Sequence, residues 1–233
     1  MIRAAIFDRD GVLTEFDLPT LRAFFEPLVP LPLDELAARW QAWCEIGAFP
    51  RSLAEESTFW GEFWDGLVRE LRLSAETRER LSAFDYTASL RAFSDARPAL
   101  QEARARGLKI GVLSNFPLAS LDASLRSVGL SSLIDVACSA SVIGASKPAA
   151  PSYLAVTSAL GVHPAECLFF DDEADCVEGA CKLGLAGYLV DRTRAHDVLA
   201  ERVVSSLDAV REIIAEGANE ANRLGTNLES THA

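Results

Sequence analysis

Basic residues are scarce in this sequence. Its 233 residues include 22 Lys and Arg against 34 Asp and Glu, for a formal charge of −12, and only three of the basic residues are lysines. A net negative charge repels polyanions, so it argues against nucleic acid as a partner. A small anion is still admissible, because a cation and a few aimed N–H donors can reverse the field locally.

Long apolar runs and paired cysteines are also missing. No segment approaches the roughly 18 apolar residues of a membrane span, and Asp8 interrupts the N-terminal run before it reaches the length of a signal peptide. The five cysteines are odd in number and include no Cys-x-x-Cys pair, which argues against a zinc site or a disulfide framework. We therefore expect a cytoplasmic protein with reduced thiols and no membrane partner. The sequence leaves the oligomeric state open.

Short apolar runs alternate with helical patterns over most of the chain. The runs are too short for helices and apolar at consecutive positions, as in strands that are covered on both faces of a parallel sheet. The alternation predicts an α/β fold with a doubly wound parallel sheet. The first apolar run starts at residue 4, and the others cover residues 108–115, 133–139, 167–172 and 186–190. The helical patterns cover residues 94–107, 117–129, 148–161 and 173–184.

Residues 16–88 interrupt this alternation. They contain no convincing strand, but their apolar residues recur at helical spacing. All four tryptophans lie here, and we expect most of them to form a small core of their own. The predicted organisation is a core of residues 1–15 and 89–217, a helical insertion of residues 16–88 and a flexible polar tail of residues 218–233.

Polar residues stand where the predicted strands end, which is where open parallel sheets bind ligands. Taken singly, each is a common turn or helix-cap residue. In chain order they are Asp8 and Asp10, Ser114 and Asn115, Lys147, and Asp171 and Asp172. This order, Asp-x-Asp-Gly-Val, Ser-Asn, Lys-Pro and Asp-Asp, resembles that of the haloacid dehalogenase superfamily of phosphatases. The helical insertion lies where members with a small helical cap carry theirs.

The two aspartates of the first motif have a physical rationale as a reaction centre. An aspartate near its reference pKa of about 3.9 is ionised at neutral pH and able to attack phosphorus. An anion then approaches an anion, so a hard cation such as Mg²⁺ and an ammonium group are needed to remove the barrier. The resemblance implies that Asp8 is the nucleophile and a metal ligand. It implies that Asp10 is the general acid and base, with its backbone carbonyl facing the metal.

The resemblance also implies roles for the later motifs. Ser114 and Asn115 would hold the phosphoryl oxygens, helped by amides at the start of the following helix, and Lys147 would neutralise charge. Asp172 would bind Mg²⁺, with Asp171 as a second or water-mediated ligand. Where members often have Asp or Asn, four residues beyond Asp172, this chain has Cys176. The roles of Cys176, Asp175 and Glu173 stay open.

The expected function is Mg²⁺-dependent hydrolysis of a small phosphorylated metabolite, with Arg51 in the segment 47–52 as a candidate substrate-binding residue. Dehalogenases of the superfamily generally lack the second aspartate, so Asp10 favours phosphoryl transfer. Relatives that cleave phosphonates use a lysine in the insertion, and residues 16–88 contain none. A phosphoglucomutase-like transferase and a catalytically idle protein-binding module are the remaining alternatives.

Overall fold

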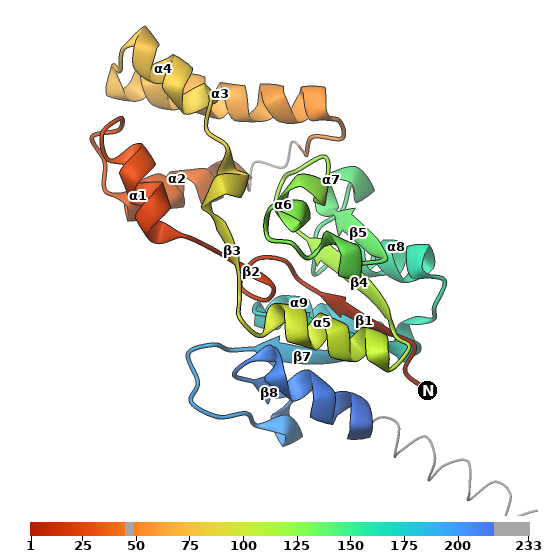
Figure 1. Ribbon diagram of the computed structural model, residues 1–233. Coiled ribbons are helices and arrows are strands. Elements are labelled where there is room, and N and C mark those ends of the chain that lie inside the picture. Colours follow the sequence, from red (N-terminus) through yellow and green to blue (C-terminus); the bar gives the residue numbers. More distant parts are fainter. Residues whose placement is uncertain (45–48, 217–233) are drawn as a thin grey trace, which may run out of the picture.

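The computed structural model describes residues 1–44 and 49–216. Its centre is a six-stranded parallel sheet in the order β5-β4-β1-β6-β7-β8 (Figure 1). The predicted doubly wound α/β fold and all five predicted strands are confirmed. The sixth strand, β8, was not predicted because it has only two residues. The strands are β1 (Ala4–Phe7), β4 (Lys109–Ser114), β5 (Val136–Ser139), β6 (Cys167–Asp171), β7 (Ala186–Val190) and β8 (Val203–Val204).

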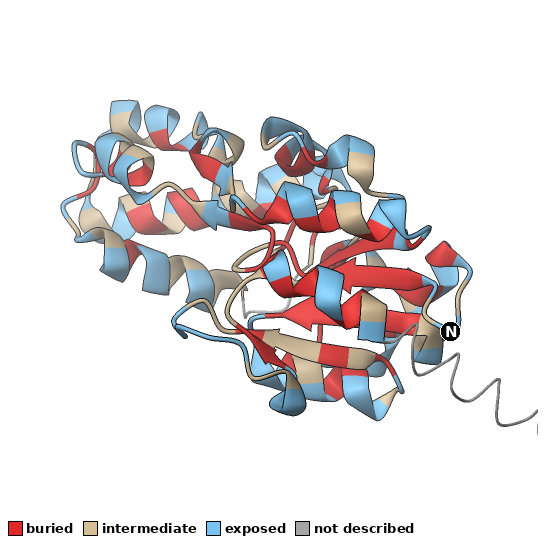
Figure 2. Ribbon diagram, turned by 60° about the horizontal axis from the view of Figure 1, so that its bottom comes forward, coloured by how far each residue is buried: buried red, intermediate tan, exposed pale blue. Residues whose placement is uncertain are grey.

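Helices cover both faces of the sheet. Alternate residues of β1 point to opposite faces, so Ala5 and Phe7 belong to one buried cluster whereas Ala4 and Ile6 belong to another. The first cluster includes residues of α5 (Ala96–Ala105) and α6 (Asp122–Ser127), and the second includes residues of α8 (Ala150–Leu160) and α9 (Ala174–Lys182). Figure 2 shows that the central strands are buried almost throughout.

The register of the central strands determines where the first motif, which begins at Asp8, lies relative to β4 and β6. Phe7 pairs with Val112 of β4 on one side and with Phe170 of β6 on the other. The next residue, Asp8, donates its backbone N–H to the carbonyl of Phe170 at 2.8 Å. Asp8 therefore lies between the ends of β4 and β6, and this brings together side chains that are more than 100 residues apart in the sequence.

The segment between β1 and β4 is mostly helical. Two short antiparallel strands, β2 (Thr14–Phe16) and β3 (Leu90–Ala92), connect it to the sheet. Between them lie α1 (Leu18–Phe25), α2 (Leu33–Cys44), α3 (Leu53–Leu71) and α4 (Ala75–Ser82). Figure 1 shows these four helices gathered on the side of the sheet away from the N-terminus. These four helices lie within residues 16–88, the segment that we call the helical insertion.

The helical insertion has its own aromatic core, as expected from its tryptophans. Trp64 is buried and stacks against Phe25 at a centroid distance of 5.8 Å. One residue of the core domain joins this cluster, because Phe116 stacks on Trp60 at 5.8 Å. Glu56 of α3 also accepts a hydrogen bond from the backbone N–H of Ala119 at 2.6 Å. The loop after β4 is thus fastened to the helical insertion.

One sequence prediction needs adjustment here, and another stays a prediction. The helix predicted from residue 117 begins at Asp122 and is six residues long, because residues 116–119 form the loop that contacts the insertion. The tail of residues 218–233 lies outside the described residues. Among the helices of the described part, none is long and apolar enough to cross a membrane.

Candidate active site

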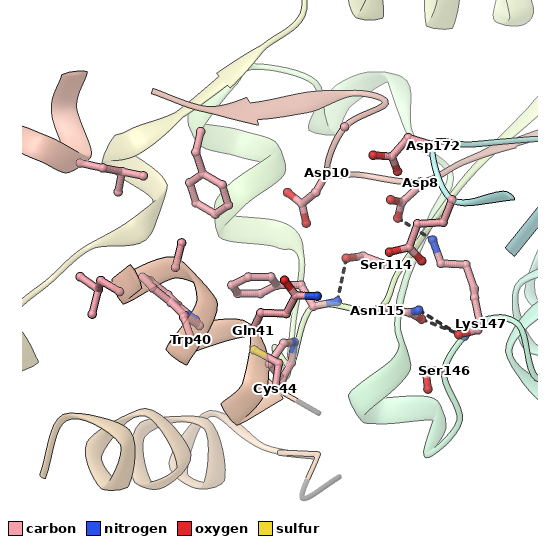
Figure 3. Close-up of a pocket in the computed structure, with 18 of the residues that line it drawn as sticks. Asp8, Asp10, Trp40, Gln41, Cys44, Ser114, Asn115, Ser146, Lys147 and Asp172 are labelled. Atoms are coloured by element: carbon pink, nitrogen blue, oxygen red, sulfur yellow. Dashed lines mark hydrogen bonds and ion pairs between the residues drawn. The ribbon is translucent and has the colours of Figure 1, made fainter. Parts of the chain in front are cut away.

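A cavity of ≈ 800 Å³ lies between the carboxyl ends of the strands and the helical insertion (Figure 3). Six of the predicted site residues line it. Asp171 is fully buried, and neither Asp171 nor Arg51 is a lining residue. The six are Asp8, Asp10, Ser114, Asn115, Lys147 and Asp172.

Lys147 is the electrostatic centre of the site. Its Nζ lies 2.7 Å from Asp8 Oδ1 and 2.7 Å from Asp171 Oδ2, and its side chain is buried. Burial lowers the pKa of Lys147, but the two carboxylates outweigh this effect and raise the pKa above its ordinary value. Lys147 is therefore a permanent cation that bridges the first and the last motif.

Asn115 holds Lys147 in place from the backbone side. Its Nδ2 donates to the Lys147 carbonyl at 3.0 Å, and its Oδ1 accepts from the Lys147 N–H at 2.8 Å. The neighbouring Ser114 is buried, and its Oγ accepts from the Phe116 N–H at 3.2 Å. The predicted contact of Ser114 and Asn115 with phosphoryl oxygens stays a prediction. The following helix, α6, starts at Asp122, and the predicted help from its amides stays a prediction.

Asp171 accepts a hydrogen bond from Lys147 and thereby orients its side chain. Its Oδ2 accepts from Lys147, and its Oδ1 accepts the backbone N–H of Glu173 at 2.9 Å. Burial raises the pKa of Asp171, and Lys147 opposes that shift. Since both oxygens already accept a hydrogen bond, this geometry favours Asp171 as a positioning residue. Its role as a second metal ligand stays a prediction.

Asp172 faces the cavity beside Asp8, and Gly11 makes this approach possible. Gly11 has φ +75°, and a Cβ at this position would lie 2.0 Å from Asp172 Oδ2. Any side chain would therefore collide with the carboxylate. The glycine of the Asp-x-Asp-Gly motif is required both for its backbone conformation and for the space that it leaves.

The carboxylates of Asp8, Asp171 and Asp172 form a cluster that suits a divalent cation. Each offers an oxygen, and these atoms lie within 4.8 Å of one another. Burial raises the pKa of Asp8 to about 7, with Lys147 opposing and Asp171 adding to the shift. Burial and the charge of Asp8 raise the pKa of Asp172 to about 6. The cluster thus holds more negative charge than Lys147 compensates, and its hard oxygen donors are those that Mg²⁺ prefers.

Asp10 forms an ion pair with its neighbour Arg9. The Arg9 guanidinium lies 2.7 Å from Asp10 Oδ2, and Thr14 Oγ1 donates to Asp10 Oδ1 at 3.3 Å. Figure 3 shows the Asp10 carboxylate on the side of the cavity nearer the helical insertion. Arg9 is fully buried, donates to Ser124 Oγ at 3.1 Å and lies 5.0 Å from the ring centre of Phe116.

The Asp-x-Asp motif leaves position 9 unspecified, so it does not predict a role for Arg9. The available signal was its charge. An arginine that follows a fully apolar strand must find a partner if it is buried, and here the partner is the next residue in the chain.

Glu173, Asp175 and Cys176 differ in whether they line the cavity. Glu173 lines the cavity, and its Oε2 accepts a hydrogen bond from the Cys176 thiol at 3.0 Å. Burial raises the pKa of Cys176, so the thiol stays protonated. Asp175 is exposed in the first turn of α9 and is not a lining residue. Of the three residues with open roles, Glu173 is the one that reaches the site.

Arg51 does not reach the cavity as described. Ser52 caps the N-terminus of α3 by accepting from the Glu55 N–H, and Arg51 lies outside that cap with its guanidinium beside Gly144. The residue is exposed. Arg51 is thus not among the residues that line the cavity, and its predicted substrate contact stays a prediction.

Comparison with known proteins agrees with this geometry. Residues 2–184 match the haloacid dehalogenase-like hydrolase family. A relative named Phosphatase MT3486, from Mycobacterium tuberculosis (strain CDC 1551 / Oshkosh), is 43% identical over 210 residues, which cover 90% of this chain and 96% of the relative. An (S)-2-haloacid dehalogenase from Xanthobacter autotrophicus is 30% identical, covering 88% of this chain and 81% of that protein.

The solved structure of the L-2-haloacid dehalogenase PA0810 has the same fold. It superposes with a TM-score of 0.72 at 21% identity and covers 92% of this chain and 100% of that one. The resemblance inferred from the order of the motifs is confirmed by these matches. The chain belongs to the family of haloacid dehalogenase-like hydrolases.

Proposed function

We propose that the protein is a Mg²⁺-dependent phosphatase that hydrolyses a small-molecule phosphate monoester through an aspartyl-phosphate on Asp8. The observation that carries this proposal is the presence of two carboxylates with different surroundings in one cavity. Asp8 is bonded to Lys147, whereas Asp10 is bonded to Arg9 and Thr14. Different surroundings allow one carboxylate to act as nucleophile while the other moves protons.

The residues present fit a divalent cation, as the cluster of Asp8 and Asp172 indicates. These two carboxylates would hold Mg²⁺ at the cavity floor, with Asp171 behind them. When bound, Mg²⁺ supplies positive charge that allows a phosphate dianion to approach Asp8.

The chain's own residues account for the two half-reactions. Asp8 attacks phosphorus, and the bond from phosphorus to the ester oxygen breaks while Asp10 gives a proton to that oxygen. Asp10 then takes a proton from a water molecule, whose oxygen attacks phosphorus and releases inorganic phosphate from Asp8. Lys147 keeps one Asp8 oxygen oriented through both steps.

The main competing activity within the family is dehalogenation, because some relatives are named haloacid dehalogenases. A 2-haloacid carries a carboxylate, which needs a cation when it is buried. Among the described lining residues, Lys147 is the one Lys, Arg or His, and it already bridges two aspartates. A halide also departs without a proton, so dehalogenation has no use for Asp10.

The test is Mg²⁺-dependent release of phosphate from 4-nitrophenyl phosphate, with chloride release from (S)-2-chloropropionate measured in parallel. We expect phosphate release that EDTA abolishes, and no chloride release. Asp8→Asn should remove the phosphatase activity, whereas Asp175→Asn, the exposed acid on α9, should retain it. Chloride release without phosphate release would contradict the proposal. The partner that we propose is a small phosphorylated metabolite, and the location that we propose is the cytoplasm.

A further inference from the structure

The cavity has two chemically different halves. The floor, at the ends of the strands, is polar and acidic, whereas the opposite wall is built by the helical insertion. We infer that the phosphate ester hydrolysed here has an uncharged, aromatic or otherwise apolar leaving group. This inference rests on the proposed phosphatase function, since it concerns the part of the substrate that lies beyond the phosphoryl group.

The wall is apolar and aromatic. Its lining includes buried Leu21, Phe25 and Leu36 of the helical insertion, and the rings of Trp40 and of Phe116, the latter from the loop after β4. Trp40 lies 6.4 Å from Phe116, measured between ring centres. Aromatic and aliphatic surfaces of this kind gain free energy by covering apolar surface of a ligand, at about 25 cal/mol per Å².

Among its described lining residues, the wall has no cation that could pair with a second anionic group of the substrate. Lys147 is the one basic side chain among the described lining residues, and it is engaged by Asp8 and Asp171. Arg39 of α2 is turned toward other partners, because it pairs with Glu35 and Glu70. Residues 45–48, whose structure is not described, contain no Lys, Arg or His in the sequence.

Binding of a charged leaving group would therefore cost free energy for two reasons. A carboxylate or second phosphate placed against the wall would lose hydration without gaining an ion pair. It would also approach the carboxylates of Asp10 and Glu173, which line the same cavity. Sugar bisphosphates and phosphorylated hydroxy acids are disfavoured on this ground.

The polar residues of the wall are neutral. Gln41 lines the cavity and lies between Trp40 and the Ser114 side of the site in Figure 3. Its amide can exchange hydrogen bonds with a hydroxyl or carbonyl group of the substrate but cannot neutralise a charge. A volume of ≈ 800 Å³ has room for a ring-sized leaving group.

The experiment compares phenyl phosphate with 4-carboxyphenyl phosphate, which differ by one carboxylate on the same ring. Both leaving groups are phenols, so the phosphoryl chemistry is closely matched. We expect kcat/KM for phenyl phosphate to be at least about tenfold higher, which corresponds to about 1.4 kcal/mol. A smaller ratio, or a preference for the carboxylate, would overturn the inference. If Mg²⁺ supports no hydrolysis of either ester, the proposed phosphatase function fails, and the inference fails with it.

A cation added to the wall provides a second test. Gln41→Arg should raise kcat/KM for 4-carboxyphenyl phosphate and thereby narrow the ratio between the two esters. Ala42→Arg is the matched control, because Ala42 is exposed on the same helix and does not line the cavity. That control should leave the ratio unchanged. If Gln41→Arg also leaves the ratio unchanged while the protein is folded by circular dichroism, the wall does not contact the leaving group.

Discussion

The guanidinium of Arg9 donates hydrogen bonds to the carboxylate of Asp10, with Nη2 2.7 Å from Oδ2 and Nε 3.1 Å from both carboxylate oxygens. The two residues are adjacent in the chain, yet Arg9 is fully buried and Asp10 reaches the cavity. Arg9 is fixed in turn by Ser124 and by the ring of Phe116. This arrangement makes Arg9 a positioning residue for the proposed general acid.

Replacing Arg9 should weaken proton transfer more than nucleophilic attack. For Arg9→Met we predict that kcat falls about a hundredfold for phenyl phosphate, because phenolate needs a proton as it leaves and general acid catalysis contributes roughly 10²–10⁴-fold. For 2,4-dinitrophenyl phosphate, whose leaving group is stable as an anion, we expect a loss of less than about tenfold. Steady-state kinetics with the two esters measure the difference.

Arg9→Lys serves as the conservative variant. A lysine keeps the charge but not the forked geometry of two N–H donors, so it should recover part of the phenyl phosphate activity. Equal losses for both esters in Arg9→Met would show that Arg9 acts only on the stability of the site.

The Lys147–Asp171 pair should carry much of the local stability. Asp171→Asn removes one of the two carboxylates that bond the buried ammonium group, and we predict a loss of about 2 kcal/mol in the free energy of unfolding, which is the order of a hydrogen bond to a charged group. Urea denaturation measures this value. Glu178→Gln is the control, since Glu178 and Lys182 form an exposed pair on α9, and such pairs contribute at most about 1 kcal/mol. Similar losses in both variants would contradict the central position of Lys147.

Gly11 should be essential for metal binding. In Gly11→Ala the new methyl group would collide with Asp172 Oδ2, so we predict that the Mg²⁺ concentration for half-maximal activity rises more than about tenfold, the effect of 1.4 kcal/mol. Gly107→Ala isolates the backbone contribution, because Gly107 has φ +76° and nothing lies within 4 Å of the added Cβ. If the two variants have the same Mg²⁺ dependence, Asp172 is not a ligand.

The stability of the metal-free protein should depend on pH through Asp8. Its pKa rises from an ordinary value of 3.8 to about 7 on folding, so the folded state binds the proton more tightly than the unfolded state. The resulting stabilisation is complete below about pH 4 and is lost as the pH rises through about 7. Thermal unfolding in EDTA should show this loss, and Asp8→Asn should show a smaller one, because Asp172, whose pKa burial raises to about 6, still contributes.

Mg²⁺ should reverse the trend, because it binds the ionised carboxylates and competes with protons. We expect the increase in Tm on adding Mg²⁺ to be larger at about pH 8 than at about pH 5. An increase that is independent of pH would mean that the cation binds away from Asp8 and Asp172.

The sheet could be predicted from the sequence because its strands are continuous apolar runs that are too short to form helices. The sequence also predicted which residues meet, since the ends of parallel strands share one edge. It did not predict what each residue does there. Asn115 bonds the backbone of Lys147 and Asp171 supports the ammonium group, and both contacts depend on side-chain directions that a motif does not contain.

The helical insertion was harder to predict in detail. Its helices follow from apolar spacing, but β2 and β3 have only three residues each and pair across more than 70 residues of chain. Arg51 is a predicted substrate contact because it lies in a segment interrupted by Gly and Pro. Its position outside the N-cap of α3 is decided by tertiary packing, which local sequence does not specify.

The central claim is that Asp8 becomes phosphorylated during turnover. The most direct measurement is mass spectrometry of the peptide that contains Asp8, after acid quenching of a reaction with Mg²⁺ and phenyl phosphate. We predict the added mass of one phosphoryl group on Asp8 and none in Asp8→Asn. In Asp10→Asn we predict a larger phosphorylated fraction with 2,4-dinitrophenyl phosphate, whose leaving group needs no proton, because only the hydrolysis step then depends on Asp10. Mg²⁺-dependent phosphate release by Asp8→Asn at the wild-type rate, with no phosphorylated peptide in either protein, would contradict the account.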